Sequence, residues 1–317
     1  MPDPSLRVDR DRSATTTASR PSRWRERTVA SNSRAKRADT TARADTTATR
    51  TPVHSRRLPS IVSSLGVVVS ASGGPARHDD WVSNPPLTAP LLFAHRGGRA
   101  HAPENTLEAF VLALRLGATG LESDVWCSAD GVPVLHHDGR IGRRFRRRTI
   151  STLTIQDLSP DVPTLADLYA RVGSQIPLSL DVKDSEAVSD ILRVASDHGA
   201  LPHLWLCHPD PELLARWRDL DSQVVLVHST RLERMSGGLE RWAADLSDAG
   251  IDAVNLPEPD WSGGLVSLFR RFGLRCLGWD AQHPRQIDRL LRMRLDGIFG
   301  DHVDRLVDGA ARLHGGI

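Results

Sequence analysis

Three acidic side chains in the middle of the chain have the types and spacing of a metal site. Glu122 and Asp124 lie two residues apart in an apolar run, so in a β-strand both side chains point to one face. Asp181 lies in a second run of the same kind. Carboxylates that converge in a poorly solvated pocket repel one another, and a hard divalent cation relieves that repulsion. These residues therefore predict one Mg²⁺ or Ca²⁺ ion, whereas Zn²⁺ is not expected.

Basic and imidazole side chains occupy neighbouring positions in the same pattern. His95 and Arg96 end one apolar run, His137 ends another, and Lys183 follows Asp181 by two residues. A guanidinium and an ammonium group beside a metal ion suit an anionic substrate, above all a phosphate. Two histidines beside such a site can act as base and acid when one is neutral and the other is protonated. The residue types thus indicate metal-assisted phosphoester chemistry.

Each of these features also has a purely structural explanation. A histidine at the end of a strand is more often structural, and a Glu-x-Asp pair is often just solvated. An Asp-x-Lys pair such as Asp181 and Lys183 is usually a salt bridge. The recurrence of such features on successive apolar runs favours a functional site over coincidence.

The elements that must position these residues alternate along residues 87–317. Strands are expected at 91–94, 120–126, 132–136, 176–182, 204–207, 224–227, 253–256, 275–279 and 297–299. Amphipathic helices are expected at 106–116, 165–171, 186–197, 211–219, 239–248, 263–272, 284–292 and 303–313. This alternation predicts parallel βα units and a (β/α)8 TIM-type barrel. An open doubly wound sheet is the alternative, but no glycine-rich phosphate loop follows the first strand.

The predicted strands are one more than an eight-stranded barrel requires. Asp130-Gly131 separates the second strand from the third and is typical of a tight hairpin turn, so a local antiparallel pair is expected there. In a TIM-type barrel the catalytic groups lie at the carboxyl ends of the strands, where the polar residues of this chain fall. The predicted fold therefore brings them to one mouth.

The formal net charge of +2 conceals two parts of opposite charge. Residues 1–60 contain 14 Arg and Lys against 6 Asp and Glu, and the remainder contains 27 against 33. Residues 1–86 are rich in Arg, Ser and Thr and poor in apolar residues, so we expect a disordered tail before a barrel domain at 87–317. The acidic balance of the barrel argues against nucleic acid as a partner.

A short apolar patch near the end of the tail bears on localisation. Arg56-Arg57 precede a run that resembles an export signal, yet the run lies more than fifty residues into the chain and is too short to span a bilayer. Three cysteines, an odd number, favour a reducing compartment over a disulfide framework. We expect a cytoplasmic protein without stable membrane insertion, with export as the alternative.

Four motifs follow one another between residues 94 and 138. They read Ala94-His-Arg-Gly-Gly, Ala102-Pro-Glu-Asn-Thr-Leu-Glu-Ala-Phe, Leu121-Glu-Ser-Asp-Val and Asp130-Gly-Val-Pro-Val-Leu-His-His-Asp. In this order they resemble the glycerophosphodiester phosphodiesterase family, and looser similarity extends the resemblance over residues 91–306. The resemblance implies a TIM-type barrel that hydrolyses glycerophosphodiesters to glycerol 3-phosphate and an alcohol, using a divalent metal ion.

The resemblance also implies roles for individual residues. His95 and His137 match the two catalytic histidines of the family, and Arg96 matches its phosphate-contacting arginine. Glu122 and Asp124 match two metal ligands. The sequence does not assign which histidine is the base and which is the acid.

Other positions are expected to support the substrate. Glu104 and Asn105 are predicted to position the loop after the first strand and to contact substrate, with helix capping as the alternative for Asn105. Lys183 is predicted to bind phosphate, and Trp279 to form a wall of the alcohol pocket. His136 stands where the family is usually apolar, so we expect it to be a bystander.

Three departures from the family pattern lie near the predicted mouth. Asp181 replaces a glutamate and is one methylene shorter, so direct ligation requires a shift of roughly 1 Å or a bridging water. Asp280 stands where the family has a hydroxyl, and Cys207-His208 replace a Ser-Phe pair. These three changes affect the expected leaving group more than the reaction type.

Two other functions remain open at this point. A lysophospholipase D-like activity on the same barrel requires apolar surface at the mouth, which tryptophans such as Trp279 leave possible. A catalytically inactive binding module is the alternative from a different class, and only Asp181 favours it.

Overall fold

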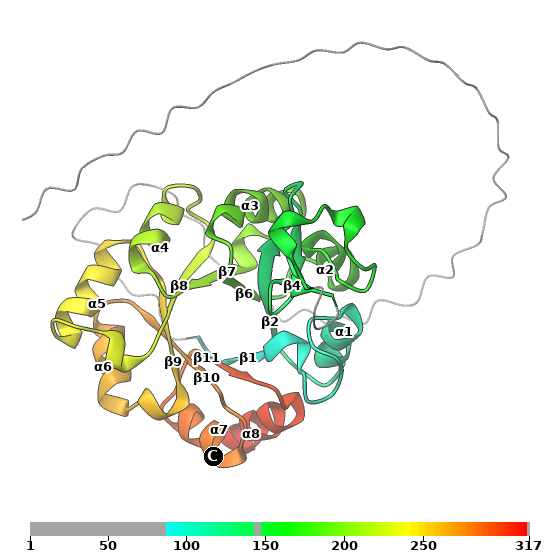
Figure 1. The fold of residues 1–317 in the computed structure, drawn as a ribbon. Helices are drawn as coiled ribbons and strands as arrows, with labels where there is room; N and C mark the ends of the chain where they lie inside the picture. Colours follow the sequence, from blue (N-terminus) through cyan, green and yellow to red (C-terminus); the bar gives the residue numbers. More distant parts are fainter. Residues whose placement is uncertain (1–86, 143–146, 316–317) are drawn as a thin grey trace, which may run out of the picture. The chain divides into compact units, whose positions relative to one another are not determined.

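The computed structural model describes residues 87–142 and 147–315, which form a closed barrel of parallel strands (Figure 1). The barrel strands are β1 (Leu91–Ala94), β2 (Gly120–Cys127), β6 (Leu178–Val182), β7 (Leu204–His208), β8 (Val225–Ser229), β9 (Ala253–Pro257), β10 (Arg275–Trp279) and β11 (Gly297–Gly300). Each pairs in parallel with the next, and β1 pairs with both β11 and β2, which closes the ring. The predicted (β/α)8 TIM-type barrel is confirmed. The predicted tail at residues 1–86, with its apolar patch, lies outside the described residues.

A helix follows each barrel strand and covers the outside of the ring (Figure 1). The helices are α1 (Leu107–Arg115), α2 (Leu165–Val172), α3 (Val188–Asp197), α4 (Pro211–Arg218), α5 (Leu239–Asp248), α6 (Gly263–Arg271), α7 (Pro284–Arg292) and α8 (Val303–Gly315). Thr106, Thr164, Asp210 and Ser262 accept backbone N–H bonds at the starts of four helices. Each such cap contributes about 1 kcal/mol and explains why the helices begin where they do.

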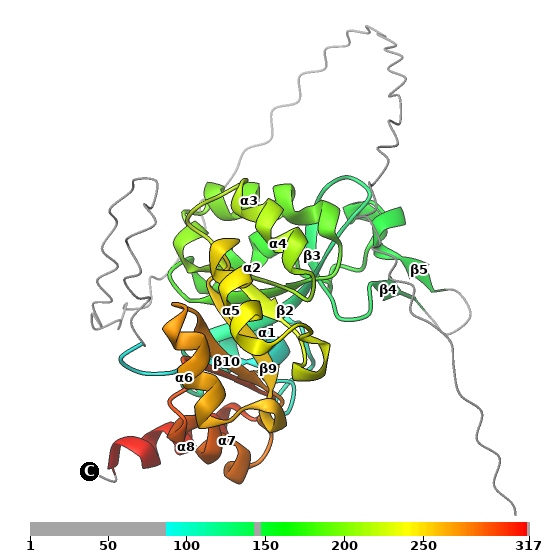
Figure 2. The ribbon, with the colours of Figure 1, turned by 90° about the vertical axis from the view of Figure 1, so that its left-hand side faces the viewer.

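The surplus strand is β3 (Pro133–Leu135), which pairs antiparallel with β2 and lies outside the ring. The hairpin turns at Gly131, whose φ of +78° is a conformation that side chains other than glycine rarely adopt. The predicted antiparallel pair is therefore confirmed. A further two-stranded sheet, β4 (Arg140–Ile141) with β5 (Arg148–Thr149), was not anticipated and extends away from the barrel (Figure 2).

Aromatic side chains fill the interior of the barrel below the mouth. The rings of Phe93 and Phe299 stack with centroids 4.5 Å apart, and Trp205 meets Phe93 edge-on at 5.7 Å. A Cβ on Gly120 would lie 2.6 Å from the Phe93 ring, and one on Gly297 would lie 3.1 Å from it. Neighbouring strands thus carry glycine where the large ring needs space, and the packed interior supports the polar site above it.

None of the helices within residues 87–142 and 147–315 combines the length and the apolar character that a bilayer span needs.

Candidate active site

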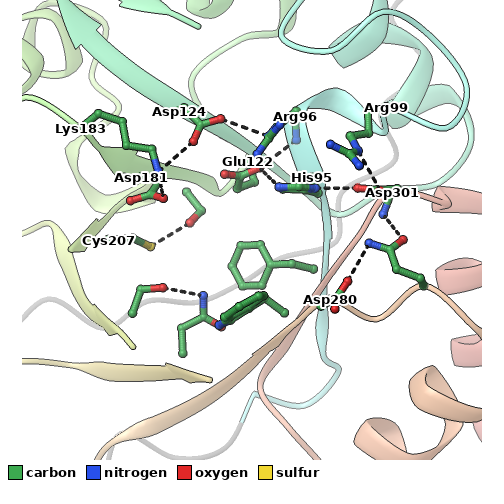
Figure 3. Close-up of a pocket in the computed structure, with 16 residues that line it drawn as sticks. His95, Arg96, Arg99, Glu122, Asp124, Asp181, Lys183, Cys207, Asp280 and Asp301 are labelled. Atoms are coloured by element: carbon green, nitrogen blue, oxygen red, sulfur yellow. Dashed lines mark hydrogen bonds and ion pairs between the residues drawn. The ribbon is translucent and has the colours of Figure 1, made fainter. Parts of the chain in front are cut away.

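A cavity of about 330 Å³ opens at the carboxyl ends of the barrel strands, where TIM-type barrels hold their catalytic groups (Figure 3). It is lined by His95, Arg96, Arg99, Glu122, Asp124, Ser179, Asp181, Lys183, Cys207, Ser229, Asn255, Trp279, Asp280, Gln282, Phe299 and Asp301. Seven of the ten residues predicted for the site are in this lining. His137, Glu104 and Asn105 are not.

A strained turn after β1 sets the direction of the first two functional side chains. Arg96 has a φ of 52°, in the left-handed region, and Gly97 follows with a φ of 81°. The carboxylate of Glu122 accepts the Arg96 backbone N–H at 2.8 Å and holds the turn against β2. A Cβ on Gly97 would lie 2.8 Å from that of Ala109, so only glycine fits beside α1. Such strain costs on the order of 1–3 kcal/mol and is typical of functional sites.

His95 lies between two carboxylates. Its Nδ1 is 2.6 Å from an oxygen of Asp301, and its Nε2 is 3.9 Å from an oxygen of Glu122 (Figure 3). Burial lowers the pKa of His95, but the charge of Glu122 and the bond to Asp301 outweigh it, and the pKa is raised. The ring is therefore fixed in orientation, and its proton is held more firmly than in a free histidine.

Asp301 is a site residue that the sequence reasoning did not assign. It follows β11 directly and also accepts a bond from Arg99 at 2.9 Å. Burial raises the pKa of Asp301, yet its bond to His95 and the arginine contact lower it to about 2. An aspartate at the end of the last barrel strand was the available signal, because that strand lies beside β1.

The acidic residues of β2 and β6 share two cations. Arg96 Nε lies 3.2 Å from one oxygen of Asp124, and Lys183 Nζ lies 3.1 Å from the other. Lys183 also bonds Asp181, so the salt bridge considered as a structural explanation of the Asp-x-Lys pair is present (Figure 3). Burial of Lys183 lowers its pKa, but Asp181 and Asp124 together raise it.

The three predicted metal ligands form an oxygen donor set that fits a hard cation. Asp124 and Asp181 are register partners on β2 and β6, and Glu122 lies two residues before Asp124 on the same strand. Burial raises the pKa of Glu122, and the charges of Asp124 and Asp181 raise it further. Burial and the two neighbouring carboxylates therefore destabilise the ionised form of Glu122. A divalent ion bound to the three carboxylates would offset their repulsion.

His137 lies apart from this cluster. It follows the antiparallel strand β3, its side chain is 39% exposed, and its Nδ1 lies 2.8 Å from its neighbour Asp138. Arg147 bonds the other oxygen of Asp138. The catalytic role of His137 stays a prediction. Its neighbour His136 accepts a backbone N–H from Asp138, and burial lowers the pKa of His136.

Glu104 and Asn105 support the loop from outside the cavity. Glu104 lies 3.0 Å from Arg96 Nη1 and 3.5 Å from Arg99. Asn105 is buried, accepts a bond from Ser123 at 2.8 Å and donates its backbone N–H to the Arg96 carbonyl. Their role in positioning the loop and contacting substrate stays a prediction.

Neutral side chains dominate the opposite wall of the cavity, which β7 to β10 form. Trp279 ends β10, and the Arg231 guanidinium lies 4.9 Å from the centre of its ring. Cys207 contacts Ser179 at 3.2 Å, and burial raises the pKa of its thiol, which disfavours the reactive thiolate. Asp280 also lines the cavity, as expected from its place after Trp279.

The comparisons with known proteins agree with this architecture. Residues 95–305 match the model of the glycerophosphoryl diester phosphodiesterase family. A glycerophosphodiester phosphodiesterase from Caldanaerobacter subterraneus is 47% identical over 238 residues, which cover 69% of this chain and 96% of that protein. Glycerophosphodiester phosphodiesterase 1 from Bos taurus is 32% identical over 161 residues, 43% of this chain and 48% of the relative. The chain thus spans about half the length of the mammalian relatives that it matches.

A solved structure shows the same fold. A phosphodiesterase from Oleispira antarctica, in complex with the product sn-glycerol 3-phosphate, aligns with a TM-score of 0.62 at 22% identity, covering 70% of this chain and 97% of the other. The family model extends from the histidine after β1 to the first turn of α8, and therefore across nearly the whole barrel. This chain belongs to the glycerophosphoryl diester phosphodiesterase family.

Proposed function

We propose that this chain hydrolyses glycerophosphodiesters to glycerol 3-phosphate and an alcohol. The observation that carries the proposal is the geometry after β1, where Asp301 holds Nδ1 of His95 and leaves Nε2 toward Glu122. The names of the relatives and the glycerol 3-phosphate complex of the Oleispira antarctica protein support the same reaction. The expected partner is a small-molecule substrate, and the acidic balance of the barrel gives no basis for nucleic-acid binding.

Two cations bind the substrate phosphate in this proposal. Arg96 and Lys183 both line the cavity and contact different oxygens of Asp124. Their charges suit the non-bridging oxygens of a phosphodiester and stabilise the negative charge that develops in the transition state. A substrate phosphate would compete with the carboxylates for these two side chains.

The proposed proton transfers use both predicted histidines. His95 protonates the leaving alkoxide, because its raised pKa keeps Nε2 protonated at higher pH than in a free histidine. His137 is the proposed base, since Asp138 contacts its Nδ1 and leaves Nε2 available to accept a proton. His137 takes this proton either from water or from the glycerol 2-hydroxyl of the substrate. If the 2-hydroxyl is the nucleophile, a cyclic phosphate forms first and water then opens it.

We assign one divalent ion, Mg²⁺ or Ca²⁺, to Glu122, Asp124 and Asp181. Members of this family generally depend on a divalent metal ion. When bound, the ion polarises the phosphate and offsets charge in the transition state. Asp181 is shorter than the glutamate of the family pattern and contacts Lys183, so its ligation requires that contact to loosen.

Release of glycerol 3-phosphate from glycerophosphocholine by the full chain tests the proposal. The assay is run with Mg²⁺, with Ca²⁺ and with a chelator. Metal-dependent release is expected, and a folded sample that releases nothing with either ion contradicts the proposal. In that case Asp181→Glu, which restores the longer side chain of the family, tests the inactive binding module directly.

A second candidate is a lysophospholipase D-like activity. Trp279 lies at the mouth and offers apolar surface to an acyl chain, although the Arg231 guanidinium lies over its ring. Assaying glycerophosphocholine and lysophosphatidylcholine side by side distinguishes the two activities, because only the lysophospholipase D-like activity predicts faster turnover of lysophosphatidylcholine.

We also propose a cytoplasmic location rather than export. Cys127, Cys207 and Cys276 are all buried and free, as expected in a reducing compartment. Fractionation of cells that express the full chain checks this, and recovery of the protein outside the cytoplasm would favour export.

A further inference from the structure

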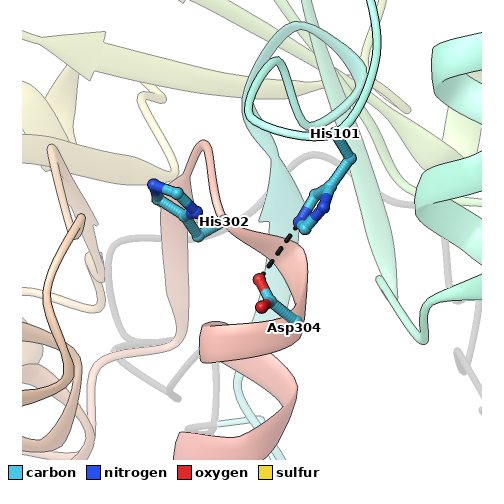
Figure 4. A group of neighbouring side chains, drawn as sticks. All are labelled: His101, His302 and Asp304. Atoms are coloured by element: carbon cyan, nitrogen blue, oxygen red, sulfur yellow. Dashed lines mark ion pairs between the residues drawn. The ribbon is translucent and has the colours of Figure 1, made fainter.

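Three side chains beside the catalytic cavity form a second cluster of potential metal ligands. His101 lies in the loop after β1, whereas His302 and Asp304 lie at the junction of β11 and α8 (Figure 4). One ligand atom from each residue lies within 4.8 Å of the other two. None of the three lines the catalytic cavity. They therefore form a site of their own, built from the two ends of the barrel sequence.

The geometry of the cluster is close to what a small metal ion needs. His101 Nε2 lies 3.1 Å from an oxygen of Asp304, and the rings of His101 and His302 are nearly perpendicular, with centroids 6.1 Å apart. Metal–ligand bonds of about 2.0–2.1 Å place tetrahedral ligands about 3.3 Å apart. His101 Nε2 thus faces the Asp304 carboxylate directly, as two ligands of one ion must.

The donor types differ from those of the catalytic carboxylates. Two imidazoles and one carboxylate select borderline transition metals, whereas the oxygen set of Glu122, Asp124 and Asp181 selects hard cations. The Asp304 side chain is 54% exposed and that of His101 is 23% exposed, so an ion can enter from solvent and keep a water as its fourth ligand. The two sites are therefore expected to discriminate between Zn²⁺ and Mg²⁺.

We propose that His101, His302 and Asp304 bind one transition-metal ion of the Zn²⁺ class. The ion would join the loop after β1 to the start of α8, which are already linked by the bond from the Ala100 N–H to the Asp301 carbonyl. Asp301, the residue before His302, bonds His95. The ion thus clamps the segment that orients the catalytic histidine.

Binding of Zn²⁺ and Co²⁺ to the untagged full chain tests the site without reference to turnover. The protein used in this experiment carries the substitutions Glu122→Gln and Asp124→Asn, so that the hard-cation site does not contribute to the measured binding. We expect one Zn²⁺ per chain by equilibrium dialysis, the visible absorption of four-coordinate Co²⁺, and a thermal midpoint that rises with Zn²⁺ but not with Mg²⁺.

His101→Ala and His302→Ala, made separately, are each expected to weaken Zn²⁺ binding about tenfold or more and to remove the Co²⁺ absorption. His203→Ala is the matched control, because His203 precedes β7 at the other end of the barrel. Undiminished Zn²⁺ binding in both ligand variants, or no Zn²⁺ binding by a folded parent chain, overturns the proposal. Because the readout is metal binding, its failure is distinct from failure of the proposed phosphodiesterase activity.

Discussion

The two walls of the catalytic cavity differ in charge and in pairing. The wall of β1, β2, β6 and β11 holds His95, Glu122, Asp124, Lys183 and other charged groups in a continuous set of ion pairs. The wall of β7 to β10 presents mainly neutral side chains. In the proposed reaction this difference would separate two tasks, because the charged wall suits the phosphate of a glycerophosphodiester and the neutral wall suits its alcohol.

The same contrast distinguishes two histidines. His95 is paired with Asp301 on the charged wall, and its pKa is raised. His228 lies on β8 with its side chain buried against Trp242, outside the barrel interior, and neither ring nitrogen has a hydrogen-bond partner among the described residues. Burial lowers the pKa of His228 to about 4. The surroundings of His95 therefore favour its protonated form, whereas those of His228 favour its neutral form.

The largest expected effect comes from removing the imidazole on the charged wall. His95→Ala should lower kcat by about 10²–10⁴-fold, the usual contribution of a general acid or base. The measurement is steady-state hydrolysis of glycerophosphocholine with saturating Mg²⁺. His208→Ala, at the end of β7 on the neutral side, is the control and should leave kcat nearly unchanged. An equal loss of kcat in the two variants would contradict the assignment of proton transfer to the charged wall.

Asp301→Asn should have the next largest effect. Loss of a carboxylate that orients a functional histidine typically costs roughly 10–100-fold. Asp301 helps to raise the pKa of His95, so its removal lowers that pKa. A general acid must be protonated, and activity is lost as pH rises through its pKa. The alkaline limb of the pH–kcat profile should therefore move to lower pH, and an unmoved limb would restrict Asp301 to a structural role.

The sequence predicts much of this architecture because apolar runs and helical periodicity are local signals. The strand at residues 275–279 and the helices at 239–248 and 284–292 have the predicted bounds, and the Asp130-Gly131 turn identifies the hairpin. Glu122 and Asp124 meet because a strand alternates its side chains between faces.

Other parts of the site depend on contacts between distant segments. Asp301 reaches His95 across 206 positions of sequence, and only closure of β11 onto β1 brings them together. His137 lies outside the cavity lining because β3 runs antiparallel and leaves the ring, so its distance from His95 cannot be read from spacing. The left-handed backbone of Arg96 likewise bonds Glu122, 26 positions further along the chain.

His228 predicts an acid sensitivity that is independent of catalysis. The unfolded chain protonates this histidine near pH 6.5, whereas the folded chain resists protonation until about pH 4. Its contribution to the free energy of unfolding is therefore full above pH 6.5 and falls as pH decreases toward 4, by about 2 kcal/mol at pH 5. Urea unfolding at pH 7 and pH 5 measures the loss. His228→Leu should reduce it by that amount, and an equal loss in the variant would contradict the assignment.

Trp279→Ala should have the smallest effect, and it tests the neutral wall. A cation over an indole ring contributes about 0.5–2 kcal/mol, so loss of the ring should raise KM for glycerophosphocholine roughly 2- to 30-fold. The measured quantity is the ratio of kcat/KM for glycerophosphocholine to that for glycerophosphoglycerol, whose alcohol group is uncharged. Trp279→Phe keeps an aromatic face and should retain most of the preference. Because Arg231 already occupies one face of the indole, Arg231→Ala should strengthen choline recognition. A preference that is unchanged in all three variants would place the alcohol against another part of the cavity.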